Sequence, residues 1–582
     1  MREIVQKSAR IRQFCKRDFS SKILSMKRAQ RTFLLIAAAT GIFASMLGGV
    51  SVNVSAGATI FATPTPSPRP RVVVTTSPTA APASSPTPKT SPAATPQQQL
   101  QTIEELQSKI RQRLNAPEVR RGRVGVKIVS LASGKVVFEN DADKYFMPAS
   151  NQKNFTVATG FERLGPDFRF VTSVYSNSLP DSSGTIKGDV RVFGRGDVSI
   201  STAFFGTTPT DPNTYFKGID RLVDKIAAAG VKKIDGSLLA DDSYFKGFYI
   251  PDTWEWDDLQ AYYGAEVSAL PINDNAVDLA VTPGAAGGPC IANILPGNAL
   301  FQINNTCITT NGPPRRTLSV TKRIDRNILD ITGTMPTNDA GYRTSIAITR
   351  PADLFVALLK RRLESSGIIV TGAARSLALN IPREANPVEI AKLESVPYRE
   401  IAGKTMKPSQ NMFTETILWA IGENARAKNP NPTGGSPLTS AQLGIAEVKS
   451  FLTSIGIPSD GILPYDGSGL SRHNLITPNA VVSLYAYMAK SSNAQAWRDS
   501  LTIGGVDGTL RNRFVGTAAA NNMRGKTGTI DQVSALSGYV KTAAGEELIV
   551  SFIVNGVAVT SQRTSLMDEI VVNLATYTGR ID

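Results

Sequence analysis

The sequence predicts an α+β fold in which an antiparallel sheet is flanked by helices and carries inserted β-rich domains. Three observations favour this class. Two β-forming runs around a Ser-Gly turn, residues 123–141, indicate a hairpin, and a second hairpin is predicted at 534–556. Helical patterns lie next to both hairpins. The stretch between them, about 167–350, is β-rich with many Gly, Asn and Asp residues, which predicts an insertion into the domain that the hairpins build.

The flanking helices are predicted from apolar residues that recur at helical spacing. The first covers residues 102–115. The second follows Pro148 and stops at Gly165-Pro166, so that it begins with the stretch "ASNQK". Three further helices are predicted at Pro351–Gly367, Ser409–Ala425 and Thr560–Gly579.

The charge of the chain is concentrated at its N-terminus. The 582 residues carry a net charge of +15. Residues 1–100 contain 13 Lys and Arg against only Glu3 and Asp18, which leaves +4 for the other 482 residues. The body therefore lacks the basic surface that nucleic-acid binding requires, and no nucleic-acid partner is predicted.

Residues 1–62 are predicted to be an export signal. A basic segment precedes an apolar run, Thr32–Val50, and the small residues "VSA" follow at Val54–Ala56. The run is also long enough to stay as a membrane anchor, and translation begins at either Met1 or Met26. Residues 63–101, rich in Pro, Thr and Ser, are predicted to be an extended linker. We therefore expect an exported protein, secreted or membrane-anchored, in the periplasm or cell-wall space.

The cysteines agree with export. Cys290 and Cys307 form the only pair outside the leader, 17 positions apart, and an oxidising compartment favours a disulfide between them over two free thiols. His473 is the single histidine of the chain, which excludes a metal site built from several histidines. No Cys/His cluster has zinc spacing, so no metal is predicted.

Ser150 and Lys153 are the candidate nucleophile and base. A serine hydroxyl becomes a good nucleophile only when a neighbouring group takes its proton. A buried lysine whose amine is neutral can do this, and the free N–H groups at a helix start can bind an oxyanion. The Ser-x-x-Lys pattern alone is weak, since it also occurs at Ser243/Lys246 and Ser319/Lys322. An ordinary pair of surface residues is the alternative.

Two further motifs strengthen this assignment. "SQN" at Ser409–Asn411 begins a predicted helix, and "KTG" at Lys526–Gly528 occurs once, where the C-terminal strands begin. Ser-x-Asn also occurs at 51–53 and 491–493, so it is not specific alone. The order Ser-x-x-Lys, Ser-x-Asn and Lys-Thr-Gly is that of β-lactamases and penicillin-binding proteins.

With these motifs, residues 102–582 resemble the class C low-molecular-mass penicillin-binding proteins, which are D-alanyl-D-alanine carboxypeptidases/endopeptidases. The segments "PASNQKNFTVATGFERLG", "LPINDNAVDLAVTPG", "MKPSQNMFTETILWAIG", "DGSGLSRHNLITP" and "RGKTGT" carry the resemblance. It implies a serine β-lactamase/DD-peptidase-like catalytic domain made of 102–166 and 385–582. Inserted domains would cover 167–384, with a nested domain at about 266–350.

The resemblance also implies roles for the motif residues. Ser150 would attack the penultimate D-Ala carbonyl of peptidoglycan stem peptides, with Lys153 as general base. Ser409 would relay a proton to the leaving group, and Asn411 would hold Lys153 and the substrate amide. Water would resolve the acyl-enzyme, and β-lactams would acylate the same serine. No metal or organic cofactor is implied.

The third motif is expected to bind the substrate. By the same resemblance, Lys526 and Thr527 would meet the terminal carboxylate of the peptide. Gly528 would let the ligand approach the strand backbone. The N–H groups of Ser150 and Thr529 would form the oxyanion hole. Gln410 stands where the family usually has Asp, and its side chain is expected to point away from the site.

Two other functions remain open from the sequence. A β-lactamase would use the same acylation residues but must add fast hydrolysis, and no Glu-x-x-Leu-Asn element of the class A kind is present. A non-catalytic cell-wall sensor would bind stem peptides or β-lactams without turnover. Turnover of a D-Ala-D-Ala peptide and of a cephalosporin separates the three functions.

Overall fold

The fold is described from a computed structural model of the chain. It describes residues 101–206, 211–297, 300–312, 315–377, 387–430 and 437–581. The predicted leader, 1–62, and the linker up to residue 100 lie outside the described residues. Within the described ranges, no helix combines the length and the apolar character needed to cross a membrane.

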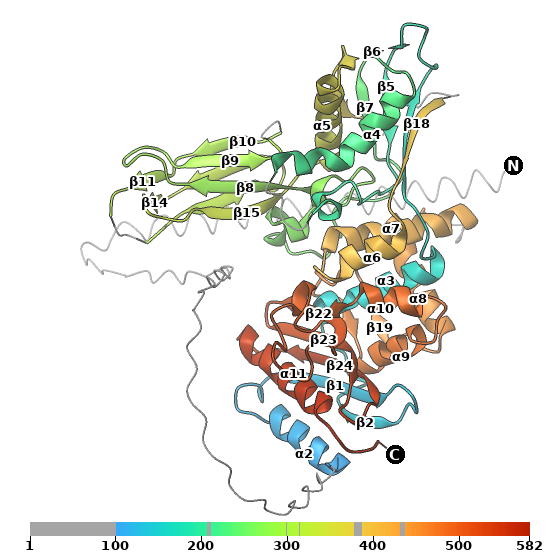
Figure 1. Cartoon of the computed structure of the whole chain (residues 1–582), viewed down its shortest axis with the longest axis vertical. Coiled ribbons are helices and arrows are strands. Elements are labelled where there is room, and N and C mark those ends of the chain that lie inside the picture. The colour runs from blue at the N-terminus through green and yellow to red at the C-terminus, as the bar shows by residue number, and fades with distance from the viewer. Residues whose placement is uncertain are drawn as a thin grey trace, which may run out of the picture. The chain divides into compact units, whose positions relative to one another are not determined.

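A six-stranded sheet joins the two ends of the folded body, as the two hairpin patterns predict. Its order is β2, β1, β24, β23, β22, β21, and every neighbouring pair is antiparallel. Figure 1 shows the blue N-terminal strands beside the red C-terminal ones. In sheet order the strands are β2 (Val136–Asn140), β1 (Arg123–Ser130), β24 (Glu547–Asn555), β23 (Val533–Lys541), β22 (Arg524–Ile530) and β21 (Thr502–Ile503).

Both faces of this sheet are buried. Successive side chains of a strand point to opposite faces. On β24, Ile549 and Ile553 belong to one hydrophobic cluster, whereas Leu548 and Val550 belong to another. One face packs against α2 (Ile103–Leu114) and α11 (Thr560–Ala575). The other packs against α3 (Lys153–Arg163), α6 (Tyr398–Met406), α7 (Asn411–Lys428), α8 (Ser440–Ser454), α9 (Pro478–Met488) and α10 (Ala494–Ser500).

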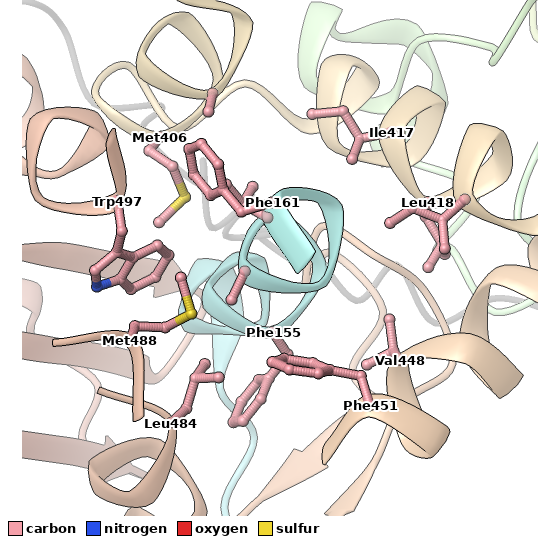
Figure 2. Packing of buried hydrophobic residues seen from close by; sticks show 14 of the residues in the cluster. Phe155, Phe161, Met406, Ile417, Leu418, Val448, Phe451, Leu484, Met488 and Trp497 are labelled. Atoms are coloured by element: carbon pink, nitrogen blue, oxygen red, sulfur yellow. The ribbon is translucent and has the colours of Figure 1, made fainter. Parts of the chain in front are cut away.

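Helix α3 runs through the middle of the cluster that contains Ile549 and Ile553. Phe155 and Phe161 are almost fully buried, and Figure 2 shows them among side chains of the neighbouring helices, including Met406, Phe451 and Trp497. Helix α3 follows directly on the 3₁₀ turn η2 (Ala149–Gln152), which carries Ser150. The core therefore fixes the position of the Ser-x-x-Lys motif.

The inserted part contains two sheets and two helices with a common core. Helices α4 (Lys217–Ala228) and α5 (Pro351–Ser365) pack against each other and against the larger sheet. That sheet has the order β17 (Ala374–Ser376), β7 (Leu238–Asp241), β5 (Val190–Phe193), β3 (Val171–Ser176) and β18 (Val388–Glu394). The smaller one consists of β16 (Ile369–Val370), β6 (Lys233–Asp235) and β4 (Thr185–Lys187).

A second group of strands, all between residues 276 and 347, lies within this insertion. We propose that these strands form the nested domain expected at about 266–350. Its three small sheets are β15 (Tyr342–Ala347), β8 (Ala276–Thr282) and β9 (Ile291–Leu295); β10 (Gln302–Asn305), β13 (Ile328–Thr332) and β12 (Ser319–Lys322); and β11 (Ile308–Thr310) with β14 (Thr334–Pro336). Outside the insertion, two short strands, β19 (Ile462–Leu463) and β20 (Leu475–Ile476), pair with each other in a separate sheet.

One predicted boundary needs adjustment. Strand β18 pairs with β3 between Val388/Ser176 and Glu394/Val171, so the inserted sheet continues beyond residue 384. The resemblance implied an end at residue 384, and a strand that pairs with a partner more than 200 residues earlier gives no local signal by which to correct it. We propose the same division of the body as before, with the insertion ending near residue 395.

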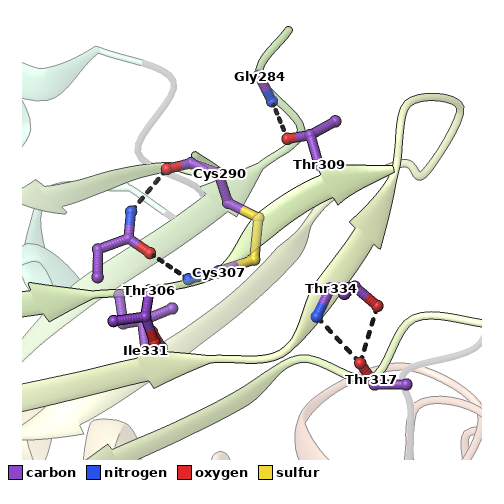
Figure 3. Close-up of a disulfide and its surroundings, with 9 residues drawn as sticks. Gly284, Cys290, Thr306, Cys307, Thr309, Thr317, Ile331 and Thr334 are labelled. Atoms are coloured by element: carbon purple, nitrogen blue, oxygen red, sulfur yellow. Dashed lines mark hydrogen bonds between the residues drawn. A yellow bond between two sulfur atoms is a disulfide. The ribbon is translucent and has the colours of Figure 1, made fainter. Parts of the chain in front are cut away.

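The structure joins Cys290 and Cys307 in a disulfide within the nested strands (Figure 3). The Cα atoms are 5.3 Å apart, a usual separation for a disulfide. The Cys290 N–H donates to the Cys307 carbonyl at 2.9 Å, and the Asn305 side chain bonds the backbone of both cysteines. The backbone contacts therefore hold the two cysteines side by side.

Loss of this disulfide should destabilise the nested strands. For a loop of this length, we expect the free energy of unfolding of the double variant Cys290→Ala/Cys307→Ala to be about 3 kcal/mol lower than that of the wild type. Chemical denaturation measures this, and a non-reduced peptide map tests the bond itself. A map with two free thiols would contradict the disulfide. Acylation of the double variant by benzylpenicillin should be unchanged, because the nested strands carry none of the motif residues.

Candidate active site

Lys153 is the centre of the site. Its side chain is fully buried, whereas Ser150 is half-buried. The Lys153 Nζ lies 2.9 Å from Ser150 Oγ, 2.6 Å from Asn411 Oδ1 and 2.7 Å from the Ser468 carbonyl oxygen. The structure thus brings the first two motifs together, although 258 residues separate Lys153 from Asn411.

Burial gives this lysine the character of a base. Removing an ammonium from water disfavours its charged form, and burial lowers the pKa of Lys153 to about 7 in spite of the opposing charges of Asp466 and Glu415. A large fraction of the amine is therefore neutral near neutral pH. Its three neighbours suit that state, because Asn411 Oδ1 and the Ser468 carbonyl accept two N–H bonds and the Ser150 hydroxyl can donate to the lone pair.

The other two Ser-x-x-Lys pairs are bonded differently. Lys246 Nζ donates to the backbone carbonyl of Ser243 at 2.6 Å, and this contact is exposed. Lys322 Nζ donates to Thr349 Oγ1 at 2.7 Å and to a backbone carbonyl. The structure therefore distinguishes the first pair from the two others by its serine–lysine hydrogen bond.

The second motif precedes helix α7. Ser409 has a left-handed backbone, φ 68°, and Gln410 is the N-cap residue, whose Oε1 accepts the Met412 N–H at 2.9 Å. Gln410 thus caps the helix, as an Asp could do. The Asn411 Nδ2 donates to the Tyr263 carbonyl at 2.9 Å, which turns Oδ1 toward Lys153. The inserted part therefore orients a motif residue.

The third motif lies on β22 and contacts the second. Lys526 is fully buried, and its Nζ lies 2.8 Å from Ser409 Oγ and 2.7 Å from the Thr527 carbonyl. Burial, followed by the charge of Lys153, holds the pKa of Lys526 well below its usual range. Two ammonium groups in one buried site would repel each other, so an anion bound there would stabilise the charged forms of both lysines.

The next residues of this strand have three different surroundings. Thr527 Oγ1 bonds Thr509 Oγ1 at 2.7 Å, and Thr529 is exposed. A Cβ atom on Gly528 would lie 2.7 Å from the Pro148 carbonyl oxygen and 3.0 Å from the Ser150 nitrogen. The close approach that requires glycine here is therefore that of the nucleophile turn.

Asp466 braces the loop that carries Ser468. Its carboxylate accepts the N–H groups of Gly469 and Ser471, each at 2.7 Å, and Trp254 Nε1 at 2.9 Å. Asp466 therefore holds the turn of this loop in place. His473 is exposed and lies beside Tyr465, with ring centroids 5.3 Å apart, as expected for a surface histidine.

Sequence reasoning missed three parts of the site. Asn151 Nδ2 donates to the Lys526 carbonyl at 3.1 Å and so ties the first motif to the third. Glu415 is buried below the Ser468 loop. The inserted segment from Trp254 to Tyr263 contacts the site through the two bonds given above. Only Glu415 had a local signal, since it follows Asn411 by four positions on one helix.

Other candidate sites are not supported. In the part of the chain that the structure describes, no group of three or more His, Cys, Asp or Glu side chains is placed to hold a metal ion. A cavity of about 750 Å³ belongs to the inserted part rather than to the motif residues. Its lining mixes both signs of charge, from Arg221, Asp224, Lys225, Lys392 and Glu394, with Ala228 and Leu393.

A half-buried serine bonded to a lysine of lowered pKa, with a Ser-x-Asn turn and a Lys-Thr-Gly strand against them, defines a class of proteins. On this sheet and helix arrangement, it is the class of serine β-lactamases and DD-peptidases.

Within that class, the chain belongs to the D-Ala-D-Ala carboxypeptidase 3 (S13) family, whose sequence profile matches residues 106–577. It is 32% identical over 490 residues to a D-alanyl-D-alanine carboxypeptidase of Actinomadura sp. (strain R39), covering 82% of this chain and 86% of that one. It is 26% identical over 437 residues to D-alanyl-D-alanine carboxypeptidase DacB of Haemophilus influenzae, covering 74% and 85%.

The fold agrees with this assignment. The structure is similar to the crystal structure of penicillin binding protein 4 (dacB) from Haemophilus influenzae, with a TM-score of 0.67 and 24% sequence identity. The similarity covers 81% of this chain and 99% of that one. The predicted fold class and family are thereby confirmed.

Proposed function

We propose that this protein is a serine D-Ala-D-Ala carboxypeptidase that cleaves peptidoglycan stem peptides through an acyl-enzyme. Lys153 takes the Ser150 proton as Ser150 Oγ attacks the penultimate D-Ala carbonyl. The C–N bond breaks, and the proton held by Lys153 passes through Ser409 to the nitrogen of the leaving D-Ala, so that Lys153 is neutral again. Water then attacks the ester and gives a proton to Lys153. As the ester C–O bond breaks, Lys153 returns this proton to Ser150 Oγ and the shortened peptide is released. The N–H groups of Ser150 and Thr529 bind the oxyanion.

One observation carries this proposal. The Lys153 Nζ is 2.9 Å from Ser150 Oγ, within the reach of proton transfer, and burial lowers the pKa of Lys153 to about 7. A lysine with its ordinary pKa of about 10.4 would be almost fully charged at neutral pH and could not accept the proton.

Lys526 and Thr527 are proposed to bind the terminal carboxylate. Among the described residues, Lys526 is the only lysine whose pKa is lowered by the charge of Lys153. Thr527 is its neighbour on β22. A carboxylate beside Lys526 would restore the charged form of that lysine and attract it. The carboxylate of a β-lactam would occupy the same position.

Lys526→Ala is expected to discriminate between substrates. A hydrogen bond to a charged group contributes about 1.5–3 kcal/mol, so kcat/KM for D-Ala-D-Ala peptides should fall at least about 10-fold more than that for neutral ester substrates. Steady-state kinetics with both substrates measures the difference. The control is Lys541→Ala, an exposed lysine at the end of β23. Equal losses for both substrates would contradict the carboxylate role.

The alternative functions are less well supported. Family membership, which rests on most of the chain, favours a peptidase over a β-lactamase. A non-catalytic sensor would not need a serine bonded to a lysine of lowered pKa, which is the arrangement observed.

We also propose that the protein acts outside the cytoplasm. Its stem-peptide and β-lactam partners are found there, and the disulfide suits an oxidising compartment. Residues 1–62 would direct export, either as a cleaved signal or as a retained anchor, with 63–101 as the linker. Comparing the mass of the protein isolated from cells with that of the full sequence distinguishes the two.

A further inference from the structure

Glu415 is a buried carboxyl group that the reaction proposed above does not use. It lies on helix α7, four residues after Asn411, and its exposed fraction is 0%. Burying a carboxyl group is costly unless the protein supplies hydrogen bonds to it. The partners of Glu415 therefore indicate what the group does.

Those partners are backbone N–H groups of the loop that contacts Lys153. The Gly467 N–H lies 3.0 and 3.1 Å from the two Glu415 oxygens, and the Ser468 N–H lies 2.7 Å from Oε1. The carbonyl of the same Ser468 accepts the Lys153 Nζ at 2.7 Å. Glu415 thus binds the backbone N–H of Ser468, and Lys153 binds its backbone carbonyl.

The loop has little freedom to move independently of the nucleophile. Gly469 has a left-handed backbone, φ 84°, and a Cβ atom there would lie 1.9 Å from the Ala149 carbonyl oxygen. Ala149 directly precedes Ser150. Asp466 fixes the other end of the turn through the Gly469 N–H. A shift of the Ser468 carbonyl would therefore be transmitted to Lys153 and to the turn of Ser150.

The charges around Lys153 are few. Asp466 and Glu415 act against the fall in the pKa of Lys153. The charge of Lys153 lowers the pKa of Lys526. Burial and then the Asp466 charge raise the pKa of Glu415 to about 8. The Ser468 hydroxyl, followed by the N–H groups of Gly467 and Ser468, acts in the opposite direction and favours the carboxylate.

We propose that Glu415 is a positioning residue of the acylation step. It holds the Gly467–Ser468 turn so that the Ser468 carbonyl fixes the Lys153 Nζ beside Ser150 Oγ. This inference rests on the proposed role of Lys153.

The test is the pH profile of benzylpenicillin acylation in the full protein. Glu415→Gln keeps the shape of the side chain but removes its charge. The acylation rate should fall by up to about 100-fold, since a misplacement of about 1 Å can cost this much. The acidic limb should stay near pH 7, because the raised pKa of Glu415 leaves this group mostly uncharged where Lys153 titrates, so the loss is one of geometry.

Two more variants test the geometry. Glu415→Asp keeps the carboxyl group but shortens the side chain, so the rate should fall while the acidic limb stays in place. Glu423→Gln is the matched control: Glu423 is a buried carboxyl of the same helix, bonded to Ser440 and Arg426 instead of the site loop. It should acylate like the wild type at every pH.

The outcomes are distinguishable. A Glu415→Gln profile that superimposes on the wild type, or one in which the acidic limb moves while the limiting rate stays the same, overturns the inference. A wild-type protein that is not acylated at any pH overturns the proposed function instead. If Glu415→Gln does not fold, Glu415→Asp with the wild-type rate overturns the positioning role.

Discussion

Ser150→Ala is expected to abolish both peptide cleavage and covalent labelling by penicillin. Alanine has no oxygen to form the acyl-enzyme, and loss of a serine nucleophile lowers kcat by on the order of 10⁶-fold. The fold should be retained, because Ser150 is only half-buried and the loss of one ordinary hydrogen bond costs about 1 kcal/mol. D-Ala release from a D-Ala-D-Ala peptide and fluorescent penicillin labelling measure the two losses.

The chain supplies a matched control for this experiment. Ser243 begins another Ser-x-x-Lys pair, but Lys246 there bonds the serine backbone rather than its hydroxyl. Ser243→Ala should keep wild-type turnover and labelling. Labelling that persists in Ser150→Ala would remove Ser150 as the nucleophile.

Replacing Lys153 should have an effect almost as large and should remove the pH dependence. In the wild type, acylation should rise about tenfold per pH unit below pH 7 and level off above it, as the amine with a pKa of about 7 loses its proton. Lys153→Ala removes the base, so the rate should fall by about 10²–10⁴-fold at high pH, with no acidic limb near pH 7.

Lys153→Arg tests the same role differently. A guanidinium does not lose its proton in proteins, so this variant keeps a cation but cannot act as a base. We expect it to be inactive at every pH at which the protein is folded. Stopped-flow acylation by a chromogenic β-lactam gives both profiles, and an acidic limb that survives in either variant would show that another group titrates.

The sequence predicted the elements that have local signals. Thr102 and Glu105 form the capping box that begins α2, and the two hairpin patterns form one antiparallel sheet. Ser-x-x-Lys and Ser-x-Asn each recur in the chain, so the three motifs were recognisable only by their order and by the helix and strand starts on which they lie.

Other features depend on contacts between distant segments, which leave no local pattern. Trp254 and Asp466 are 212 positions apart, and their hydrogen bond attaches the inserted part to the site loop. Tyr263 contacts Asn411 through a backbone carbonyl, which any residue could provide. Strand β18 belongs to the inserted sheet because of its pairing with β3, not because of its composition.

The most direct test of the account is the intact mass of the purified protein with and without benzylpenicillin, followed by a peptide map. A stable adduct of one ligand mass is expected on the peptide that contains Ser150. If no adduct forms and penicillin stays intact, the motifs are inert and the protein is a binding module. If penicillin disappears without an adduct, the protein is a β-lactamase, and the peptidase account is contradicted.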